Sequence, residues 1–247
     1  MAGINKSFGA VHVLHDVDFF VYPGEVTALV GDNGAGKSTL VKCVTGIYGI
    51  DTGQVSFAGS PVSIAGPKDA AALGIEVVYQ DLALCDNLDI VQNLFLGRER
   101  KKFGLLDESG MENLARETLA SLSVRTVKSV RQAVSSLSGG QRQTVAIAKA
   151  VLWNSKVVLL DEPTAALGVA QTKEVLSLVR NLADKGLGVV LISHNMNEVL
   201  EVADRVAVMY LGRLAAEVKA SETNREQLVQ LITSGRSGSI GLQEARS

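Results

Sequence analysis

The chain has 247 residues, 47% of them hydrophobic, which is enough for one large α/β domain or for a core domain with a smaller insert. A formal charge of −2 provides no global field to attract nucleic acid or a membrane, which leaves local basic patches as the one electrostatic route to such partners. The 4% of aromatic residues argues against a surface that stacks on nucleic-acid bases. No run approaches the roughly 18 apolar residues that span a bilayer, and the start lacks a secretory signal, so we expect a cytoplasmic protein.

The first clear element is a short apolar run, Val26–Val30, which predicts a buried strand. A glycine-rich turn follows it, and Thr39–Thr45 then has the pattern of a helix. Strand, loop and helix in this order are the opening of a phosphate-binding α/β unit.

The turn itself, Gly31-Asp32-Asn33-Gly34-Ala35-Gly36-Lys37-Ser38, fits G-x-x-x-x-G-K-[ST]. Its glycines let backbone N–H groups face phosphate oxygens, and the start of the helix adds a positive dipole end. Lys37 supplies a charge to the β- and γ-phosphates, and Ser38 offers a hydroxyl to Mg²⁺. The predicted nucleotide-binding residues here are Gly31, Asn33, Gly34, Ala35, Gly36, Lys37, Ser38 and Thr39.

From about residue 87 to 150 the chain has helical periodicity, most clearly over Glu112–Leu122, and few strand-like runs. We interpret this region as a helical insert. Near its end, Leu137-Ser138-Gly139-Gly140-Gln141 precedes a helical stretch. By physics alone this is either an anion-binding helix start or an ordinary helix cap.

The apolar run Val157–Leu160 leads directly into Asp161 and Glu162. This places two carboxylates at the carboxyl edge of a predicted sheet, where ligands of open α/β folds bind. Asp161 is suited to hold Mg²⁺, and Glu162 to polarise an attacking water as general base. An acidic strand end alone is weak evidence, but together with the phosphate loop it is strong.

Later elements complete the α/β pattern. Val189–Ile192 predicts another buried strand, and Gln171–Asp184 has the period of a crossover helix. After them, Leu211-Gly212-Arg213 predicts a hairpin turn. A short helix is predicted over Asn224–Ile232, with Thr223 as its N-cap and Gly235 as its stop, and then a frayed tail of about a dozen residues.

Taken with these motifs, Ser138 to Gln141 resembles the signature motif of the ABC ATPase family, and its place between the phosphate loop and Asp161 matches that family's order. The resemblance covers nearly the whole chain, about Ala2 to Ile232. It implies an α/β fold, a P-loop NTPase core with a mostly parallel sheet, an antiparallel β subdomain and an inserted α-helical subdomain. The implied division is a single ABC ATPase domain over 1–247, with a RecA-like core at 1–86 and 151–218, a helical subdomain at 87–150 and a C-terminal helix and tail at 219–247.

The resemblance also implies roles for individual residues. Gln80 is similar to the glutamine that senses Mg²⁺ and the attacking water, and His194 to the switch histidine that contacts the γ-phosphate. Phe8 resembles the aromatic residue that stacks on adenine, although His12, Tyr22 or a core role for Phe8 stay open. Without the family context, a lone histidine after a strand is usually a polar turn residue.

Sites in this family are composite, because Ser138 and Gly140 of one copy cover the γ-phosphate held by the other copy. The resemblance therefore implies ATP and Mg²⁺ as cofactors, and as partners a second copy of the chain, integral membrane permease subunits and, indirectly, a solute-binding protein, with no nucleic acid. It also implies a peripheral position on the cytoplasmic face of the membrane.

Finer motifs, among them Tyr79-Gln80-Asp81-Leu82 and Asn93 to Glu99, are similar to the ATPases of bacterial monosaccharide importers of the ribose, xylose and fructose type. Two features depart from the family. Residue 168 is Gly where Asp is common, so a carboxylate contact across the dimer is missing. The chain also begins a few residues before Phe8, where a first strand is usual, so a shortened strand could weaken adenine binding and the sheet edge.

Two other functions are weighed against import. One is a non-transport ABC ATPase that acts on nucleic acid or ribosomes, although no basic arm, tandem module or coiled-coil insertion is visible. The other is a nucleotide-dependent regulator with little turnover, which the presence of Glu162 makes less favourable.

Overall fold

The computed structural model describes residues 1–122 and 129–242, and in these a six-stranded sheet runs in the order β12-β11-β3-β10-β9-β6. Neighbouring strands pair in parallel except β12, which joins β11 as an antiparallel hairpin. The strands are β3 (Val26–Gly31), β6 (Ile75–Val78), β9 (Val157–Asp161), β10 (Gly188–Ile192), β11 (Arg205–Tyr210) and β12 (Arg213–Lys219). The three strands predicted from continuous apolar runs are confirmed.

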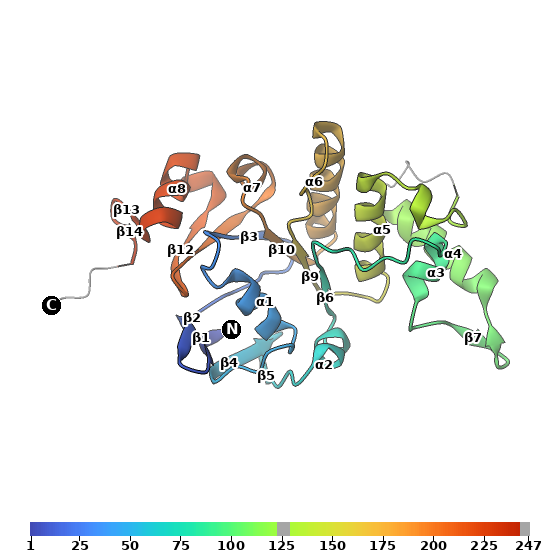
Figure 1. Cartoon of the computed structure of the whole chain (residues 1–247), viewed down its shortest axis with the longest axis horizontal. Helices are drawn as coiled ribbons and strands as arrows, with labels where there is room; N and C mark the ends of the chain where they lie inside the picture. The colour runs from blue at the N-terminus through green and yellow to red at the C-terminus, as the bar shows by residue number, and fades with distance from the viewer. Residues whose placement is uncertain (123–128, 243–247) are drawn as a thin grey trace.

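A second, antiparallel sheet has the order β2-β1-β4-β5. Its strands are β1 (Ala2–Phe8), β2 (Val11–Val17), β4 (Thr52–Phe57) and β5 (Ser60–Val62). Figure 1 shows this sheet below the parallel sheet, with α1 (Lys37–Val44) between the two. Residues 2–8 form a first strand of seven residues, in which Ala2 pairs with Gln54 and Ile4 with Val17, so this sheet edge is built although a shortened strand was expected.

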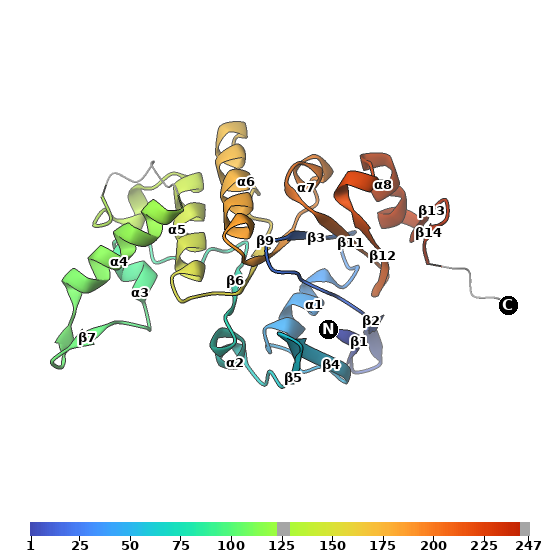
Figure 2. The ribbon, with the colours of Figure 1, turned by 180° about the vertical axis from the view of Figure 1, so that it is seen from behind.

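Alternation along β9 divides the hydrophobic core between the two faces of the parallel sheet. Leu159 packs with α1 and the antiparallel sheet, whereas Val158 and Leu160 pack on the opposite side. That opposite side is covered by α6 (Val169–Asp184), α7 (Met196–Val202) and α8 (Arg225–Ser234), as Figures 1 and 2 show. The sheet is therefore covered on both faces, which explains why its strands are apolar throughout.

Helices gather at one end of the molecule, beyond β6 (Figure 1). They are α3 (Ile90–Phe95), α4 (Glu108–Ser121) and α5 (Gly139–Val151), with a 3-10 turn at Val134–Ser136. The short helix α2 (Pro67–Ala72) lies elsewhere, near β5. Arg131 joins α3 to α4 through Asp89 and Glu112, and its hydrogen bond holds the pKa of Glu112 below the ordinary value. Between α3 and α4 the structure adds a small hairpin, β7 (Lys101–Lys102) and β8 (Leu105–Leu106), which the sequence did not predict.

The C-terminal region agrees with the sequence in part. The hairpin turn at Leu211 and Gly212 is confirmed, and so is Gly235 as the end of α8, where its φ of 73° suits glycine. The predicted cap Thr223 is wrong by one residue, because the side chain of Asn224 accepts the hydrogen bond from the Gln227 amide. A 3-10 turn at Ala220–Glu222 precedes α8. The prediction of a frayed tail is wrong for residues 236–241, where β13 (Arg236–Ser237) pairs with β14 (Ile240–Gly241). Residues 243–247 lie outside the described part of the chain.

Within the described ranges, no helix has both the length and the apolar character that crossing a membrane requires.

Candidate functional site

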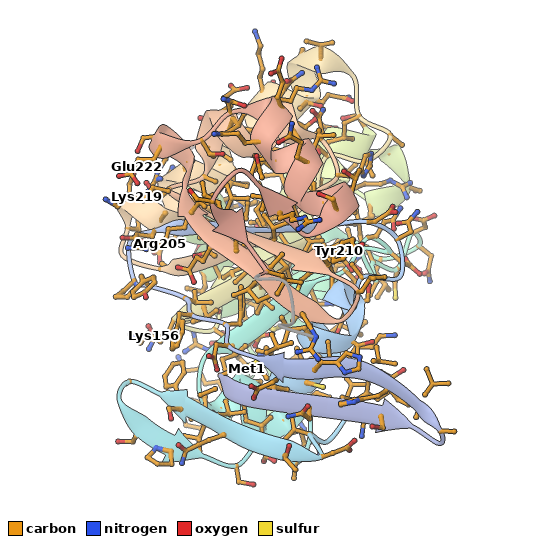
Figure 3. All side chains as sticks on the ribbon, turned by 90° about the vertical axis from the view of Figure 1, so that its left-hand side faces the viewer. Met1, Lys156, Arg205, Tyr210, Lys219 and Glu222 are labelled. Atoms are coloured by element: carbon orange, nitrogen blue, oxygen red, sulfur yellow. The ribbon has the colours of Figure 1, made fainter. Side chains whose placement is uncertain are left out.

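The loops that carry the predicted site residues leave one edge of the parallel sheet. Gly31 pairs with Met209 near the end of β11, and Asp161 pairs with Ile192 at the end of β10. Figure 3 shows Arg205 and Tyr210 at opposite ends of β11, and the Tyr210 end is the edge with the site. Because parallel strands end together, the phosphate loop, the Asp161–Glu162 turn and the segment of His194 lie side by side there.

Gln80 follows the last strand of this edge. It lies two residues after the end of β6, whose Val78 pairs with Leu160 just before Asp161, and its side chain is exposed. Register therefore puts Gln80 at the same edge as the two carboxylates.

The backbone of the phosphate loop depends on glycine at two positions. Gly31 has a φ of 155°, and a Cβ there would lie 2.5 Å from the carbonyl oxygen of Met209. Gly36 has a φ of 103°, and a Cβ there would lie 2.9 Å from Leu14 Cδ2 on β2. Only glycine lets the loop pass this close to β11 and β2.

The loop ends at the start of α1, where backbone N–H groups form an anion-binding site. Helix α1 begins at Lys37 with Gly36 as its N-cap, no side-chain cap and no acidic residue in its first turn, so the first backbone N–H groups face outward unshared by a side chain. Lys37 Nζ donates to the carbonyl oxygens of Gly31 at 2.8 Å and Asp32 at 3.0 Å. Burial lowers the pKa of Lys37 although Glu162, Asp32 and Asp161 act to raise it. The remaining predicted loop residues, Asn33, Gly34, Ala35, Ser38 and Thr39, lie on this same turn.

Asp161 is the strongest candidate for a metal ligand. Burial, and then the neighbouring Glu162, raise the pKa of its carboxyl above the ordinary value. A half-buried carboxylate of raised pKa is one that a divalent cation would stabilise, and Ser38 in the first turn of α1 adds a hydroxyl. An acidic side chain and a hydroxyl are oxygen ligands of the kind that Mg²⁺ takes together with phosphate oxygens and waters.

The raised pKa of Asp161 predicts that its ionised carboxylate lowers the stability of the ligand-free protein at neutral pH. Its folded-state pKa lies above the unfolded value, so the stability it contributes is fully present below the unfolded pKa and is lost as pH rises through the folded pKa. At neutral pH the buried charge therefore weighs against folding. We expect Asp161→Asn to raise the Tm of the ligand-free protein by a few degrees at pH 7, but little at pH 3, and to reduce Mg²⁺-dependent ATP hydrolysis by at least about a hundredfold. Thermal unfolding at the two pH values and a steady-state ATPase assay check this; a lower Tm at pH 7 would contradict it.

Glu162 and His194 form the central pair of the site. His194 Nδ1 lies 2.7 Å from Glu162 Oε2, and Glu162 is largely buried whereas the imidazole is 78% exposed. Glu162 has a φ of 50°, in the left-handed region that costs energy for a side chain of this size. Its backbone N–H donates to the carbonyl oxygen of Ile192, which fixes the turn. Strain held at a carboxylate that faces a histidine is typical of a catalytic centre.

Glu198, which sequence reasoning missed, connects the two loops of this pair. Its Oε2 accepts a hydrogen bond from the Thr164 hydroxyl at 2.5 Å, two residues after Glu162. Its Oε1 accepts from the Asn195 side-chain amide at 2.8 Å, next to His194. The only sequence signal is a carboxylate in the first turn of a helix that follows a candidate histidine. The bridge makes Glu198 a positioning residue for both groups.

This bridge can be tested by comparing two substitutions. Glu198→Ala removes both acceptors, and we expect kcat for ATP hydrolysis to fall roughly ten- to hundredfold with ATP affinity unchanged, because Glu162 and His194 lose their alignment. Glu198→Gln keeps an acceptor for Asn195 and a donor for the Thr164 hydroxyl, so it should retain most of the activity. Steady-state kinetics and nucleotide titration distinguish the cases; equal losses in both variants would argue against positioning.

The Ser138 to Gln141 segment forms the start of α5. Ser138 is the N-cap in a capping box, in which its own N–H donates to Gln141 Oε1 at 2.9 Å and its Oγ accepts from the Gln141 N–H at 3.4 Å. Gly139 and Gly140 lie against Leu167 and Gln171, since a Cβ on either glycine would approach these side chains within 3.2 Å. In Figures 1 and 2 α5 lies at the helical end of the molecule, whereas α1 lies between the two sheets.

Gly168, where the family commonly has Asp, is the N-cap of α6. Its φ of −74° and ψ of 163° are open to any residue, and its N–H donates to Gln171 Oε1 at 3.2 Å. A Cβ there would meet nothing closer than 3.9 Å. The missing carboxylate is therefore not enforced by the local backbone.

Three aromatic residues are candidates for the contact with adenine. Phe8 is 41% exposed, so it is not a core residue, and its ring packs edge-on against Tyr48 with centroids 4.9 Å apart. It ends β1 beside β2, which passes the phosphate loop, and His12 lies on β2. Tyr22 instead stacks with Arg205, 4.5 Å from its ring centroid, at the opposite edge of the sheet. The arrangement favours Phe8 or His12 over Tyr22.

Comparisons with known proteins identify the family of the chain. The sequence pattern of the family described as ABC transporter matches residues 14–165. The chain is 46% identical over 243 residues to a xylose/arabinose import ATP-binding protein of Sulfolobus acidocaldarius, covering 98% of this chain and 96% of that protein. It is 44% identical to a fructose import ATP-binding protein of Rhizobium meliloti, with 95% and 93% covered. It is 43% identical to a ribose import ATP-binding protein of Rubrobacter xylanophilus, covering 96% of this chain but only 47%, about half, of that protein.

Solved structures give the same result for the fold. A nucleotide-free ATP-binding cassette from an ABC transporter superposes with a TM-score of 0.79 at 28% identity, over 88% of this chain and 89% of the other. An ATP-binding cassette of an ABC transporter in its ADP conformation superposes with a TM-score of 0.79 at 27% identity, over 94% and 93%.

Proposed function

The chain belongs to the ABC transporter family as an ATP-binding and ATP-hydrolysing import subunit, and from this premise we propose that the solute it helps to import is a monosaccharide. The observation that carries the catalytic part is the 2.7 Å contact of Glu162 with His194 beside the phosphate loop. The sugar specificity is supported by the relatives, which are named for the import of xylose or arabinose, fructose and ribose. The same relatives favour import over action on nucleic acid.

ATP binding follows from the phosphate loop. The outward N–H groups at the start of α1 and the Lys37 ammonium receive the phosphates, and Phe8 or His12 stacks on the adenine. Asp161 and Ser38, with Gln80 nearby, would hold Mg²⁺, which when bound neutralises charge on the phosphate oxygens.

Hydrolysis is assigned to Glu162. Its carboxylate accepts a proton from water as the water oxygen bonds to the γ-phosphorus and the bond to the bridging oxygen of ADP breaks. His194 is held beside the same carboxylate, where it would contact the γ-phosphate, while Glu198 aligns both loops. The low exposure of Glu162 limits competing solvent around its carboxylate.

The active unit is a dimer of this chain in this proposal. Helix α5, which begins at the Ser138 to Gln141 segment, lies at the helical end and α1 between the two sheets, which supports a second copy supplying this segment to the γ-phosphate. ATP then bridges the two copies, and its hydrolysis releases them.

Import also needs integral membrane permease subunits and, indirectly, a solute-binding protein, with this chain on the cytoplasmic face. We place the permease contact around residues 81–98. A groove of about 310 Å³ opens there, lined by Asp81, Leu96, Arg98 and Trp153 among others. Arg98 is fixed at its rim, 2.9 Å from Glu76 and stacked 5.5 Å from the Trp153 ring centroid. A groove with an aromatic wall and a fixed cation suits a short helix of the permease.

Purification of the tagged chain from detergent-solubilised membranes tests this function. We expect an integral membrane permease to co-purify, and uptake of labelled xylose, fructose or ribose to stop when the chromosomal copy carries Glu162→Gln. An intact complex without a membrane protein would contradict import, and salt-sensitive binding of nucleic acid would support the alternative.

A further inference from the structure

A small hairpin stands out from the helical end of the molecule. Strands β7 and β8 pair Lys101 with Leu106 and Lys102 with Leu105, and Phe103 and Gly104 form the two-residue turn. Figures 1 and 2 both show it projecting at the end of the long axis opposite to the C-terminus. Every residue from 96 to 106 is exposed. The hairpin is therefore available to something outside the chain.

Its apolar side chains lie in solvent. Phe103 is 96% exposed, Leu105 76% and Leu106 54%. Single exposed apolar residues are common on proteins, but a contiguous group at the tip of a projection indicates an interaction site. The fold gains little from packing Phe103 and Leu105, and Leu106 is about half covered.

The backbone of the turn is also unfavourable for the residue it carries. Phe103 has a φ of 53° and Gly104 of 83°, the pattern of a turn that favours Asn-Gly. A bulky aromatic side chain in the left-handed region is strained, so asparagine would suit the fold better at position 103. The phenyl group is kept at a cost to stability.

Three cations precede this apolar tip, and Asp107 and Glu108 follow it. Arg100, Lys101 and Lys102 are exposed, and Lys102 Nζ lies 5.9 Å from the Phe103 ring centroid. Among the ion pairs found in residues 1–122 and 129–242, none involves these three cations. Glu99 offsets part of this charge; its pKa is lowered by a hydrogen bond from the Gly97 N–H and also by Lys101. The segment from 100 to 106 contains no acidic residue.

We propose that this hairpin binds the surface of an anionic lipid bilayer. Phe103, Leu105 and Leu106 enter the boundary between headgroups and acyl chains, and Arg100, Lys101 and Lys102 contact lipid phosphates. The cations on one strand and the apolar side chains on the turn and the other strand match the phosphate and acyl layers of a bilayer surface. Six residues are too few for a stable protein interface, which buries about 800 Å² on each partner, so the observations favour lipid over a protein loop.

The contact is weak by itself and adds to attachment through other partners. Because the chain carries a net charge of −2, the attraction is local to the hairpin and orients the helical end toward the membrane. The proposal requires neither ATP nor a second copy, so it stands or falls independently of the proposed import function.

Co-sedimentation with vesicles tests the proposal directly. The purified chain, without nucleotide, is mixed with vesicles of equimolar phosphatidylcholine and phosphatidylglycerol, or of phosphatidylcholine alone. We expect binding to the anionic vesicles only, weakened by raising NaCl. The double change Lys101→Gln with Lys102→Gln should lower the partition coefficient by about thirtyfold, and Phe103→Asn by about tenfold.

Matched variants at the other end control for general charge and hydrophobicity. Lys219→Gln with Arg225→Gln removes two exposed cations near α8, as the position of Lys219 in Figure 3 illustrates, and Val229→Asn removes an exposed apolar side chain. Both should bind vesicles like the wild type.

Stability separates a functional Phe103 from a structural one. Because asparagine relieves the strain, Phe103→Asn should keep or raise the Tm while it weakens vesicle binding. Equal binding to neutral and anionic vesicles, or equal binding by wild type and both hairpin variants, would overturn the proposal. Loss of permease co-purification in the hairpin variants with vesicle binding intact would assign the hairpin to a protein partner instead.

Discussion

Replacing Glu162 with glutamine is expected to slow ATP hydrolysis by about two to four orders of magnitude and to leave ATP binding intact. Glutamine has the same shape, so the turn with its φ of 50° and the contact with His194 are retained. Only the proton acceptor for water is lost. With hydrolysis blocked, Mg-ATP should convert the protein from monomer to dimer, which light scattering measures as a doubled mass.

The matched control is Glu198→Gln, the same chemical change on the neighbouring carboxylate. Both variants lose one negative charge near His194, so a merely electrostatic effect would slow hydrolysis in both. We expect only the Glu162 variant to accumulate the dimer. Undiminished hydrolysis in Glu162→Gln would refute the assigned base, and a mass unchanged by bound ATP would mean that the permease is needed to hold the two copies together.

Replacing Lys37 with alanine should have the second large effect. The ammonium lies at the centre of the loop, 2.8 Å from the Gly31 carbonyl oxygen and 3.0 Å from that of Asp32. Removing a half-buried charge that binds phosphate should weaken ATP affinity by about ten- to a hundredfold and reduce hydrolysis by about a thousandfold or more. Isothermal titration and an ATPase assay measure both quantities.

Adenosine provides the internal control for this change. It carries the base that Phe8 or His12 contacts but no phosphate, so its weak binding should be the same in Lys37→Ala and the wild type. Lys37→Ala also removes the hydrogen-bond donor to the carbonyl oxygens of Gly31 and Asp32. A parallel loss of adenosine binding would therefore show that the substitution has distorted the loop.

The chemistry of the site was predictable where it is local in the chain. The phosphate loop is a contiguous run whose glycines and lysine act through their own backbone, and Asp161 with Glu162 follows a strand directly. Glu198 was not predictable in this way, because its bond to Thr164 spans 34 residues and exists only after β9 and β10 are paired. The role of His194 was suggested by the family resemblance and not by spacing, and its contact with Glu162 was found only in the structure.

The fold was likewise predictable where the signal is local in the sequence. Continuous apolar runs located β3, β9 and β10, because strands buried on both faces need them. The cap of α8 was misplaced because Thr223 and Asn224 are both good caps and only the tertiary structure chooses between them. The hairpin at 101–106 lacked every usual signal, since it has two-residue strands and a phenylalanine where a turn favours asparagine.

The sharing of hydrophobic side chains between α3, α4, α5, α6 and the parallel sheet has a consequence for how the chain can be divided. Val145 and Ile147 of α5 belong to the same buried cluster as Val158 and Leu160 of β9. A fragment containing the helical end alone would leave these α5 side chains in water, and removal of that end would uncover β9. The helical end and the sheet therefore depend on each other in folding, and removing either one lowers the free energy of unfolding of the other.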